Sequence, residues 1–381
     1  MDFDLTEEQR VLKQTIREFA QREVAPGASE RDEKGRFPHE LIPEMAQLGL
    51  FGIMIPEEYG GAGLDALSLA IVIEELARVD GAMALIVASH NSLCSEHIYN
   101  FGNDEQRKRF LVPLAHGEKL GAWSLTEPGS GSDAGALKSR AKLDGNHWVI
   151  DGEKLFTTQG STAGIYTIMA STDPSRRAKG ISAFIVEAGT PGLSVGKVEN
   201  KLGVRASDTA SLQLEGLRVP KENLLGKLNG AFEDALRVLD GGRIGIGSMA
   251  VGLARGALEE STRYAKQRQQ FGRPIATFEA IQWKLSDMAT EIDAARLMVY
   301  RAAQLRGMGQ PFKRAASEAK LFASEVAMRA TTQAIQIHGG YGYLKDFPVE
   351  RYFRDARVCE IGEGTSEIQR MVIAKELLRS G

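Results

Sequence analysis

Two helix-like regions enclose one strand-like region in this chain, and this order constrains the fold more than any other feature. In the first region apolar residues recur at helical spacing, beginning with Val11, Leu12, Ile16 and Phe19 behind a capping box at residues 6–9. From residue 119 onward, short apolar runs alternate with Asp-Gly, Asp-Pro and Pro-Gly turn signals. Long helical patterns return near Ala231. The predicted order is therefore helical, β, helical.

The patterns also predict individual elements and domains. Helices are expected over residues 38–50, 66–78, 104–116, 278–306 and 311–337, and strands over residues 147–150, 165–169 and 181–186. A chain of 381 residues is too long for one ordinary core. We predict an α+β protein, mainly α, with a helical N-terminal domain at 1–118, a β domain at 119–228 and a C-terminal helical bundle at 229–381.

Composition argues against several classes of protein. The net charge of -3, with 25% charged residues, offers no broad basic surface, so nucleic-acid binding is not expected. Cys94 and Cys359 are too few and too far apart for a disulfide framework, and the six histidines form no metal-binding pair, so no metal is expected. The chain opens with acidic residues and has no apolar stretch of 18 residues, which predicts a cytoplasmic protein without a membrane span.

One short motif imitates a nucleotide-binding fingerprint. Residues 129–134 satisfy the spacing G-x-G-x-x-A, but a dinucleotide fold requires a helix directly after it. The residues that follow, 137–150, show a strand pattern instead. We therefore do not interpret this segment as a Rossmann motif.

Near the end of the chain a single carboxylate lies between two glycines. Gly362 and Gly364 leave the backbone around Glu363 free to adopt unusual conformations and to approach a ligand. Ser366 and Gln369 have the spacing of a capping box that opens a last helix. An isolated loop of this kind is usually a solvated turn, but in the company of the other motifs it indicates a general base.

Five motifs in order resemble the acyl-CoA dehydrogenase family across essentially the whole chain. They are residues 123–133 (WSLTEPGSGSD), 156–158 (FTT), 268–273 (RQQFGR), 336–342 (QIHGGYG) and the Glu363 loop. The resemblance implies a helical N-terminal domain, a central β-barrel and a C-terminal four-helix bundle. It also implies a homotetramer that holds FAD in the cleft and across a subunit interface.

The resemblance assigns cofactor contacts residue by residue. Those expected around the flavin ring and its pyrophosphate are Trp123, Leu125, Thr126, Ser132, Phe156 and Thr158. Arg268 and Phe271 are expected to reach the phosphates and the adenine from a neighbouring subunit, because a guanidinium forks onto phosphate and a ring stacks on a base. Further contacts are expected from Gln336, Gly339, Gly340, Thr365 and Glu367, the last standing where many relatives carry Gln.

The same resemblance assigns the substrate site. Ser132, Asp240, Arg243 and Gly364 are expected to contact the substrate. In some relatives the base lies on the first helix of the bundle, at a position that is Gly242 here; glycine cannot accept a proton, which leaves Glu363. Glu363 would remove the α proton, the flavin would take the β hydride, and the backbone N–H of Glu363 would donate to the thioester oxygen. We expect the pKa of Glu363 to rise when substrate excludes water.

The expected substrate is a short or short-branched acyl-CoA, oxidised to the trans-2-enoyl-CoA in fatty acid or branched-chain amino acid catabolism. Residues 89–95 resemble the short-chain and short-branched-chain members more than the medium-chain ones and would line the base of the acyl pocket, which favours about four to five carbons. The absence of Arg from residues 82–98 argues against a dicarboxylic substrate. Electrons would pass to an electron-transfer flavoprotein. Two alternatives stay open: an acyl-CoA oxidase that uses oxygen, and a catalytically silent acyl-CoA-binding homologue.

Overall fold

The N-terminal part of the protein is helical in the computed structural model, which describes residues 4–379. The capping box predicted at residues 6–9 is confirmed, since Thr6 accepts from the backbone of Gln9 and the Gln9 side chain reaches back to Thr6. The helices are α1 (Glu7–Phe19), α2 (Ala28–Lys34), α3 (Ile42–Gln47), α4 (Ala66–Ala77), α5 (Gly81–Ser89), α6 (Glu96–Phe101), α7 (Asp104–Gln106) and α8 (Val112–Ala115).

Two local features differ from the predicted helices of this region. The helix expected over residues 38–50 is shortened to α3, because Pro43 fits only its first turn and Gly49 leaves the helical conformation with φ +71°. Three π-helical turns, at Ala20–Val24, His90–Ser95 and Arg107–Leu111, extend or join neighbouring helices. The turn at His90–Ser95 makes α5 and α6 one continuous segment.

The middle of the chain forms a strand-rich domain. Its strands are β1 (Gly121–Ser124), β2 (Arg140–Asp144), β3 (His147–Thr158), β4 (Ile165–Ser171), β5 (Ile181–Glu187), β6 (Leu193–Val198), β7 (Thr209–Pro220) and β8 (Leu224–Leu225). They form one sheet in the order β6-β7-β3-β2-β4-β5-β8, with β1 paired to β4 in parallel. The pairing ends at β6 and at β8, so the expected barrel is an eight-stranded sheet whose hydrogen bonds do not run full circle among the described residues.

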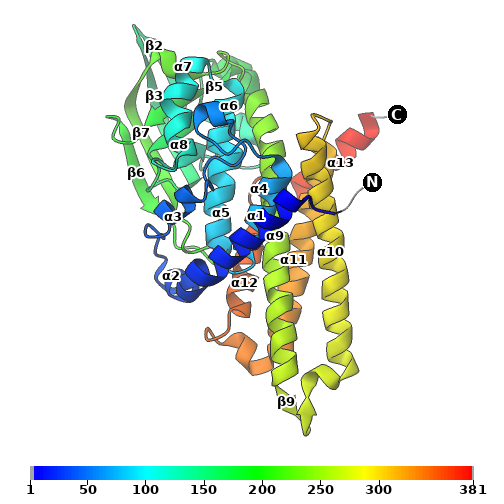
Figure 1. Cartoon of the computed structure of the whole chain (residues 1–381). Helices are drawn as coiled ribbons and strands as arrows, with labels where there is room; N and C mark the ends of the chain where they lie inside the picture. Colours follow the sequence, from blue (N-terminus) through cyan, green and yellow to red (C-terminus); the bar gives the residue numbers. More distant parts are fainter. Residues whose placement is uncertain (1–3, 380–381) are drawn as a thin grey trace.

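Three long helices dominate the C-terminal part. They are α9 (Ala231–Gln267), α10 (Glu279–Gly307) and α11 (Lys313–His338), followed by α12 (Val349–Ala356) and α13 (Ser366–Arg379). Between α9 and α10 lies a small hairpin of β9 (Gln269–Gln270) and β10 (Arg273–Pro274). Figure 1 shows the long helices running away from the strand-rich domain, with β9 at their far end.

The core joins the two helical parts into one unit. All residues of α4 and α5 are buried, and both helices pack against α9. Helix α5 has no charged side chain, and a helix that is apolar on every side belongs in an interior. Helix α4 buries Glu74 and Glu75, which both pair with Arg255 of α9. No helix in residues 4–379 is long and apolar enough to cross a membrane. Both cysteines are buried and free, as expected.

The central domain is thus strand-rich and both flanking parts are helical, as predicted. The residue at which each domain begins or ends stays a prediction.

Candidate active site

The loop before α13 is held at several points. Thr365, not Ser366, caps the helix: its hydroxyl accepts from the backbone N–H of Ile368 at 3.4 Å, and Ser366 is already the first helical residue. The predicted capping box is therefore wrong by one residue. Gln369 has a different task, since its buried side-chain amide donates to the backbone oxygens of Glu363 at 3.3 Å and Gly364 at 2.8 Å.

The Glu363 carboxylate lies over a glycine of α9. A Cβ at Gly242 would collide with Oε2 of Glu363, so the missing side chain provides the space that the carboxylate occupies. Leu93 borders the same space, 3.2 Å from that Cβ position. Oε2 is buried without a hydrogen-bond partner among the described residues. Glu363 also has a φ of +52°, a strained conformation for a residue with a side chain, and such strain persists mainly at functional sites.

Charged groups surround this carboxylate. Lys320 of α11 is fully buried and donates from Nζ to the backbone oxygen of Gly364 at 2.7 Å. Arg243 of α9 pairs with Asp240 at 2.5 Å and donates to the Ser317 hydroxyl at 3.2 Å. The two predicted substrate residues, Asp240 and Arg243, are thus paired with each other and belong to the same site as Glu363.

Burial shifts the protonation of the Glu363 carboxylate. Loss of water raises the pKa of Glu363 to about 7, against the lowering influence of Lys320 and Arg243, and the carboxylate of Glu96 adds to the rise. The protein therefore raises this pKa without any substrate. A base with a pKa near 7 is matched to proton transfer at neutral pH.

The flavin-ring residues predicted in the strand-rich domain lie on neighbouring segments. Trp123 of β1 donates from Nε1 to Nδ1 of buried His97 at 2.9 Å. The backbone oxygen of Thr126 accepts from the N–H of Leu155, which brings the end of β1 beside Phe156. Phe156 stands at a bulge of β3 with φ +53° and a side chain 62% exposed.

The remaining residues of this group differ in exposure. Leu125 is buried, Ser132 is exposed on the loop after β1, and Thr158 is partly buried at the end of β3.

A buried ion pair holds the segment that follows β1 in place. Lys154 Nζ donates to Glu127 at 2.6 Å and to the backbone oxygen of Leu125 at 3.3 Å. Glu127 also accepts from the backbone N–H groups of Lys138 and Ser139. The Glu127 carboxylate therefore joins the segment after β1 to β3 and to the residues just before β2.

A second group of predicted cofactor residues gathers at the far end of the long helices. Phe271 occupies the turn between β9 and β10, where φ is +53° and Gly272 follows with φ +76°, and its side chain is 92% exposed. Arg268 caps α9 and lies over the ring of Tyr341, 5.3 Å from its centre. A groove of about 590 Å³ lies here, and its lining includes Arg268, Phe271, Gly339 and Gly340. Gln336 lies exposed on the last turn of α11.

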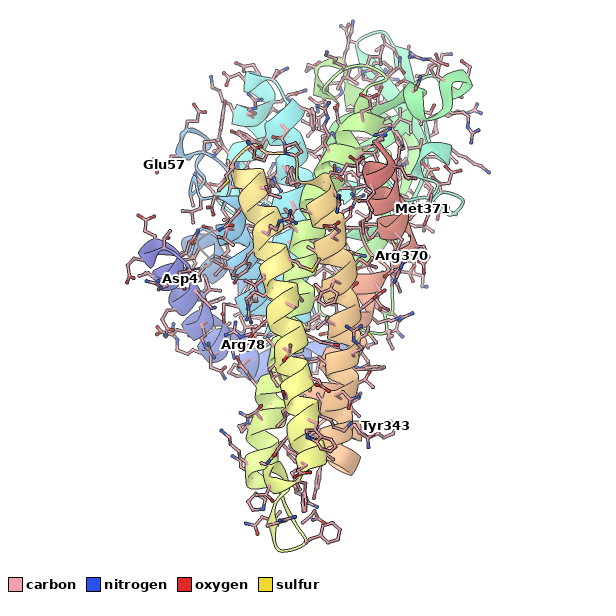
Figure 2. All side chains as sticks on the ribbon, turned by 90° about the vertical axis from the view of Figure 1, so that its right-hand side faces the viewer. Asp4, Glu57, Arg78, Tyr343, Arg370 and Met371 are labelled. Atoms are coloured by element: carbon pink, nitrogen blue, oxygen red, sulfur yellow. The ribbon has the colours of Figure 1, made fainter. Side chains whose placement is uncertain are left out.

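The far-end group lies far from the Glu363 site within one chain. Gly242 and Arg268 are about 26 residues apart on α9, which corresponds to about 39 Å along the helix. Figure 2 agrees, with Arg370 and Met371 of α13 near one end of the long helices and Tyr343 near the other. The structure therefore brings Glu363, Gly364, Thr365, Asp240 and Arg243 together but leaves Arg268, Phe271, Gln336, Gly339 and Gly340 at the opposite end. Glu367 is exposed on the first turn of α13.

Sequence reasoning missed several residues of the site. The sequence did not predict Lys320, which holds the Glu363 loop, or the pair Lys154–Glu127, which holds the segment after β1. Gln369 was predicted only as a capping-box residue, not as a donor to the loop backbone. Lys320 could have been found, because it shares a helix face with buried Ala316, Ala319 and Ala323, where a lysine needs a partner. No group of three or more potential metal ligands occurs in residues 4–379.

Comparison with known proteins identifies the family. The chain matches the N-terminal domain of acyl-CoA dehydrogenase over residues 6–118, the middle domain over 122–217 and the C-terminal domain over 230–378. The chain belongs to the acyl-CoA dehydrogenase family. Its members are flavoprotein oxidoreductases that act on a CH–CH bond.

Three relatives cover the whole chain. The short-chain specific acyl-CoA dehydrogenase of Clostridium acetobutylicum is 50% identical over 100% of both chains. Butyryl-CoA dehydrogenase from Megasphaera elsdenii is 45% identical with a TM-score of 0.98, again over 100% of both chains. A chain in a structure of the electron transferring flavoprotein of Acidaminococcus fermentans is 48% identical with a TM-score of 0.98 over 100% of both chains.

Proposed function

We propose that the chain is an FAD-dependent dehydrogenase that converts a short or short-branched acyl-CoA into the trans-2-enoyl-CoA. The observation that carries this proposal is the buried, unpartnered Oε2 of Glu363, seated in the space left by Gly242. A buried acceptor without a partner is costly, so its position calls for a ligand that supplies a proton.

The protein's own part in the reaction is proton removal and charge stabilisation. Glu363 Oε2 takes the α proton as the Cα–H bond breaks. The electron pair of that bond is delocalised toward the thioester carbonyl and becomes the second Cα–Cβ bond when the β carbon loses its hydride. The backbone N–H of Glu363 would donate to the carbonyl oxygen, and Gln369 and Lys320 fix that backbone by holding the oxygens of residues 363 and 364. The nearby cation of Arg243 favours the charged form of the base.

Bound FAD would supply the acceptor for the β hydride, chemistry that no ordinary side chain provides. The residues of the chain suit such a group. Phe156 offers an exposed aromatic face beside the backbone of Leu125 and Thr126, and Trp123 is fixed by His97. At the far end, Arg268 offers a cation and Phe271 an exposed ring, next to two glycines with no atoms within 4 Å of their Cβ positions.

A second subunit would complete each site. One dinucleotide cannot reach both groups of cofactor residues in the same chain. Trp123 packs against the same hydrophobic cluster as Leu239 of α9, close to Gly242, and about 39 Å of helix separates Gly242 from Arg268. We therefore propose that Arg268, Phe271, Gln336, Gly339 and Gly340 serve the site of a neighbouring copy, in a homotetramer. Closed symmetric assemblies of this kind are the common form of soluble oligomers.

An electron-transfer flavoprotein is the proposed electron acceptor. The similarity to a chain in the structure of such a flavoprotein from Acidaminococcus fermentans supports this choice. The names of the short-chain and butyryl-CoA relatives support the acyl length. A cytoplasmic location stays a prediction.

The test is anaerobic reduction of the purified, flavin-loaded protein by butyryl-CoA. We expect the native protein to lose its yellow colour, and Glu363→Gln to retain FAD and ligand but to react at least roughly 10²- to 10⁴-fold more slowly. A Glu363→Gln protein that is reduced at the native rate contradicts the assignment of the base. Rapid reoxidation by air during turnover would favour the oxidase instead.

A further inference from the structure

A second carboxylate lies beside the one that we assign as the base. Glu96 of α6 pairs with Arg306 of α10 at 2.8 Å, and their side chains are only 7% and 17% exposed. A Cβ at Gly241 would stand 3.0 Å from both oxygens of Glu96 and would collide with Arg306. Two adjacent glycines of α9 thus seat two carboxylates: Gly242 seats Glu363, and Gly241 seats Glu96.

The Glu96–Arg306 pair is not fully satisfied. Oε2 of Glu96 is buried and has no hydrogen-bond partner among the described residues. Asn100 contacts only the other oxygen, at 3.5 Å. A buried ion pair with a free oxygen is a poor source of stability, because the loss of hydration offsets the attraction between the charges. Its position suggests a role at the site.

The direction of the acyl chain follows from the place of the base. The α carbon must lie at Glu363 Oε2, and the large, charged CoA portion must stay toward solvent. The acyl tail then points inward, where Leu93 borders the Gly242 space. Leu93 belongs to the π-helical turn at His90–Ser95, and Glu96 is the first residue after that turn. The acyl tail would therefore contact Leu93 first and the Glu96–Arg306 pair next.

We propose that Glu96, held by Arg306, is a specificity-determining residue that closes the acyl pocket behind a short acyl group. This inference rests on the proposed function. Methylenes gain by contact with Leu93, but a longer tail must press on a carboxylate and a guanidinium that have already lost most of their water. The pair therefore excludes longer chains by charge as well as by volume.

The test compares chain-length profiles. For the flavin-loaded enzyme, kcat/KM is measured with butyryl-, hexanoyl- and octanoyl-CoA. We expect Glu96→Ala/Arg306→Ala to raise the octanoyl-to-butyryl ratio at least ~10-fold, since one methylene in an apolar pocket already changes kcat/KM by about 10-fold or more. Glu96→Met/Arg306→Met keeps the volume and removes both charges, so it should fold where the alanine pair does not, and should raise the ratio by a smaller factor.

A matched control separates specificity from general damage. Asp32 and Arg354 form a comparable pair at 2.6 Å with side chains 11% and 17% exposed, on α2 and α12. Asp32→Ala/Arg354→Ala should leave the octanoyl-to-butyryl ratio unchanged. If a folded Glu96/Arg306 variant that holds flavin keeps the native ratio, the assignment of Glu96 is overturned. If the unsubstituted enzyme is reduced by none of the three acyl-CoAs, the proposed function itself fails.

Discussion

Glu363 and Gly242 depend on each other at the scale of single residues. The carboxylate occupies the volume that any side chain at position 242 would need, so the absence of a Cβ is part of the site. We predict that Gly242→Ala lowers kcat at least ~10²-fold by displacing the base, while the alanine favours the α9 helix by about 1 kcal/mol. Steady-state kinetics would measure the loss of activity, and thermal unfolding would show whether the helical gain outweighs the close contact of the new Cβ with Leu93 at 3.2 Å.

Gly245→Ala is the control for that prediction, because the nearest atom to its added Cβ is the Ser92 hydroxyl, 3.3 Å away. An equal loss of activity in both variants would mean that packing of α9, rather than the position of Glu363, limits the reaction.

The raised pKa of Glu363 predicts how activity depends on pH. The base works only as a carboxylate, so log(kcat/KM) should rise with pH up to about 7 and then level off. Glu96 adds a like charge that raises this pKa, so Glu96→Gln should move the rising limb to lower pH. Glu187→Gln, which removes another arginine-paired carboxylate, should leave the limb in place. A limb unmoved by Glu96→Gln would exclude electrostatic coupling between the two carboxylates.

At the scale of elements, the buried pair Lys154–Glu127 joins β3 to the end of β1 and the start of β2. Breaking one partner leaves a buried charge alone, which costs about 3–5 kcal/mol. We predict that Lys154→Met lowers the urea midpoint accordingly, and that it weakens FAD binding because Leu125 loses its anchor. The double variant Lys154→Met/Glu127→Gln should regain part of the stability. A Lys154→Met protein with native stability and native flavin fluorescence would rule out this role.

Elements with a regular apolar period were predictable, and local irregularities were not. The helices α10 and α11 lie within two residues of their expected bounds, because an apolar face repeated over many turns leaves few alternatives. The π turn at His90–Ser95 has no signal in a periodic pattern, since it depends on packing against α9. The cap at Thr365 was misplaced by one residue because Thr365 and Ser366 are chemically equivalent as caps.

The residues of the candidate site also divide into those that the sequence could predict and those that it could not. Glu363 stood out because a single carboxylate between two glycines is unusual and because the surrounding motifs have family meaning. Lys320, Glu96 and Arg306 depend on contacts between helices that are far apart in the sequence, such as the 2.8 Å pair from α6 to α10. Such contacts are a property of the packed molecule and cannot be obtained from spacing along the chain.

At the scale of the whole molecule, the long helices carry one group of the proposed site residues near each end. This arrangement predicts complementation between two inactive proteins. Glu363→Gln lacks the proposed base but keeps Arg268. Arg268→Ala lacks the cation proposed to bind the FAD phosphates but keeps Glu363. In a mixed pair of subunits that share sites, one site carries both defects and the other carries neither. Coexpression at equal levels should therefore restore about a quarter of the native activity, because half of randomly formed pairs are mixed.

The measurement is turnover of butyryl-CoA by the purified mixture, compared with each variant alone and with the two proteins mixed after purification. Mixing the two proteins after purification should restore less activity than coexpression, because mixed pairs then form only if assembled subunits exchange. If coexpression gives no more activity than the sum of the two variants, Arg268 acts within its own chain or not at all. Activity recovered only on coexpression requires that the two ends of the helices belong to different sites, which about 39 Å of helix between Gly242 and Arg268 already favours.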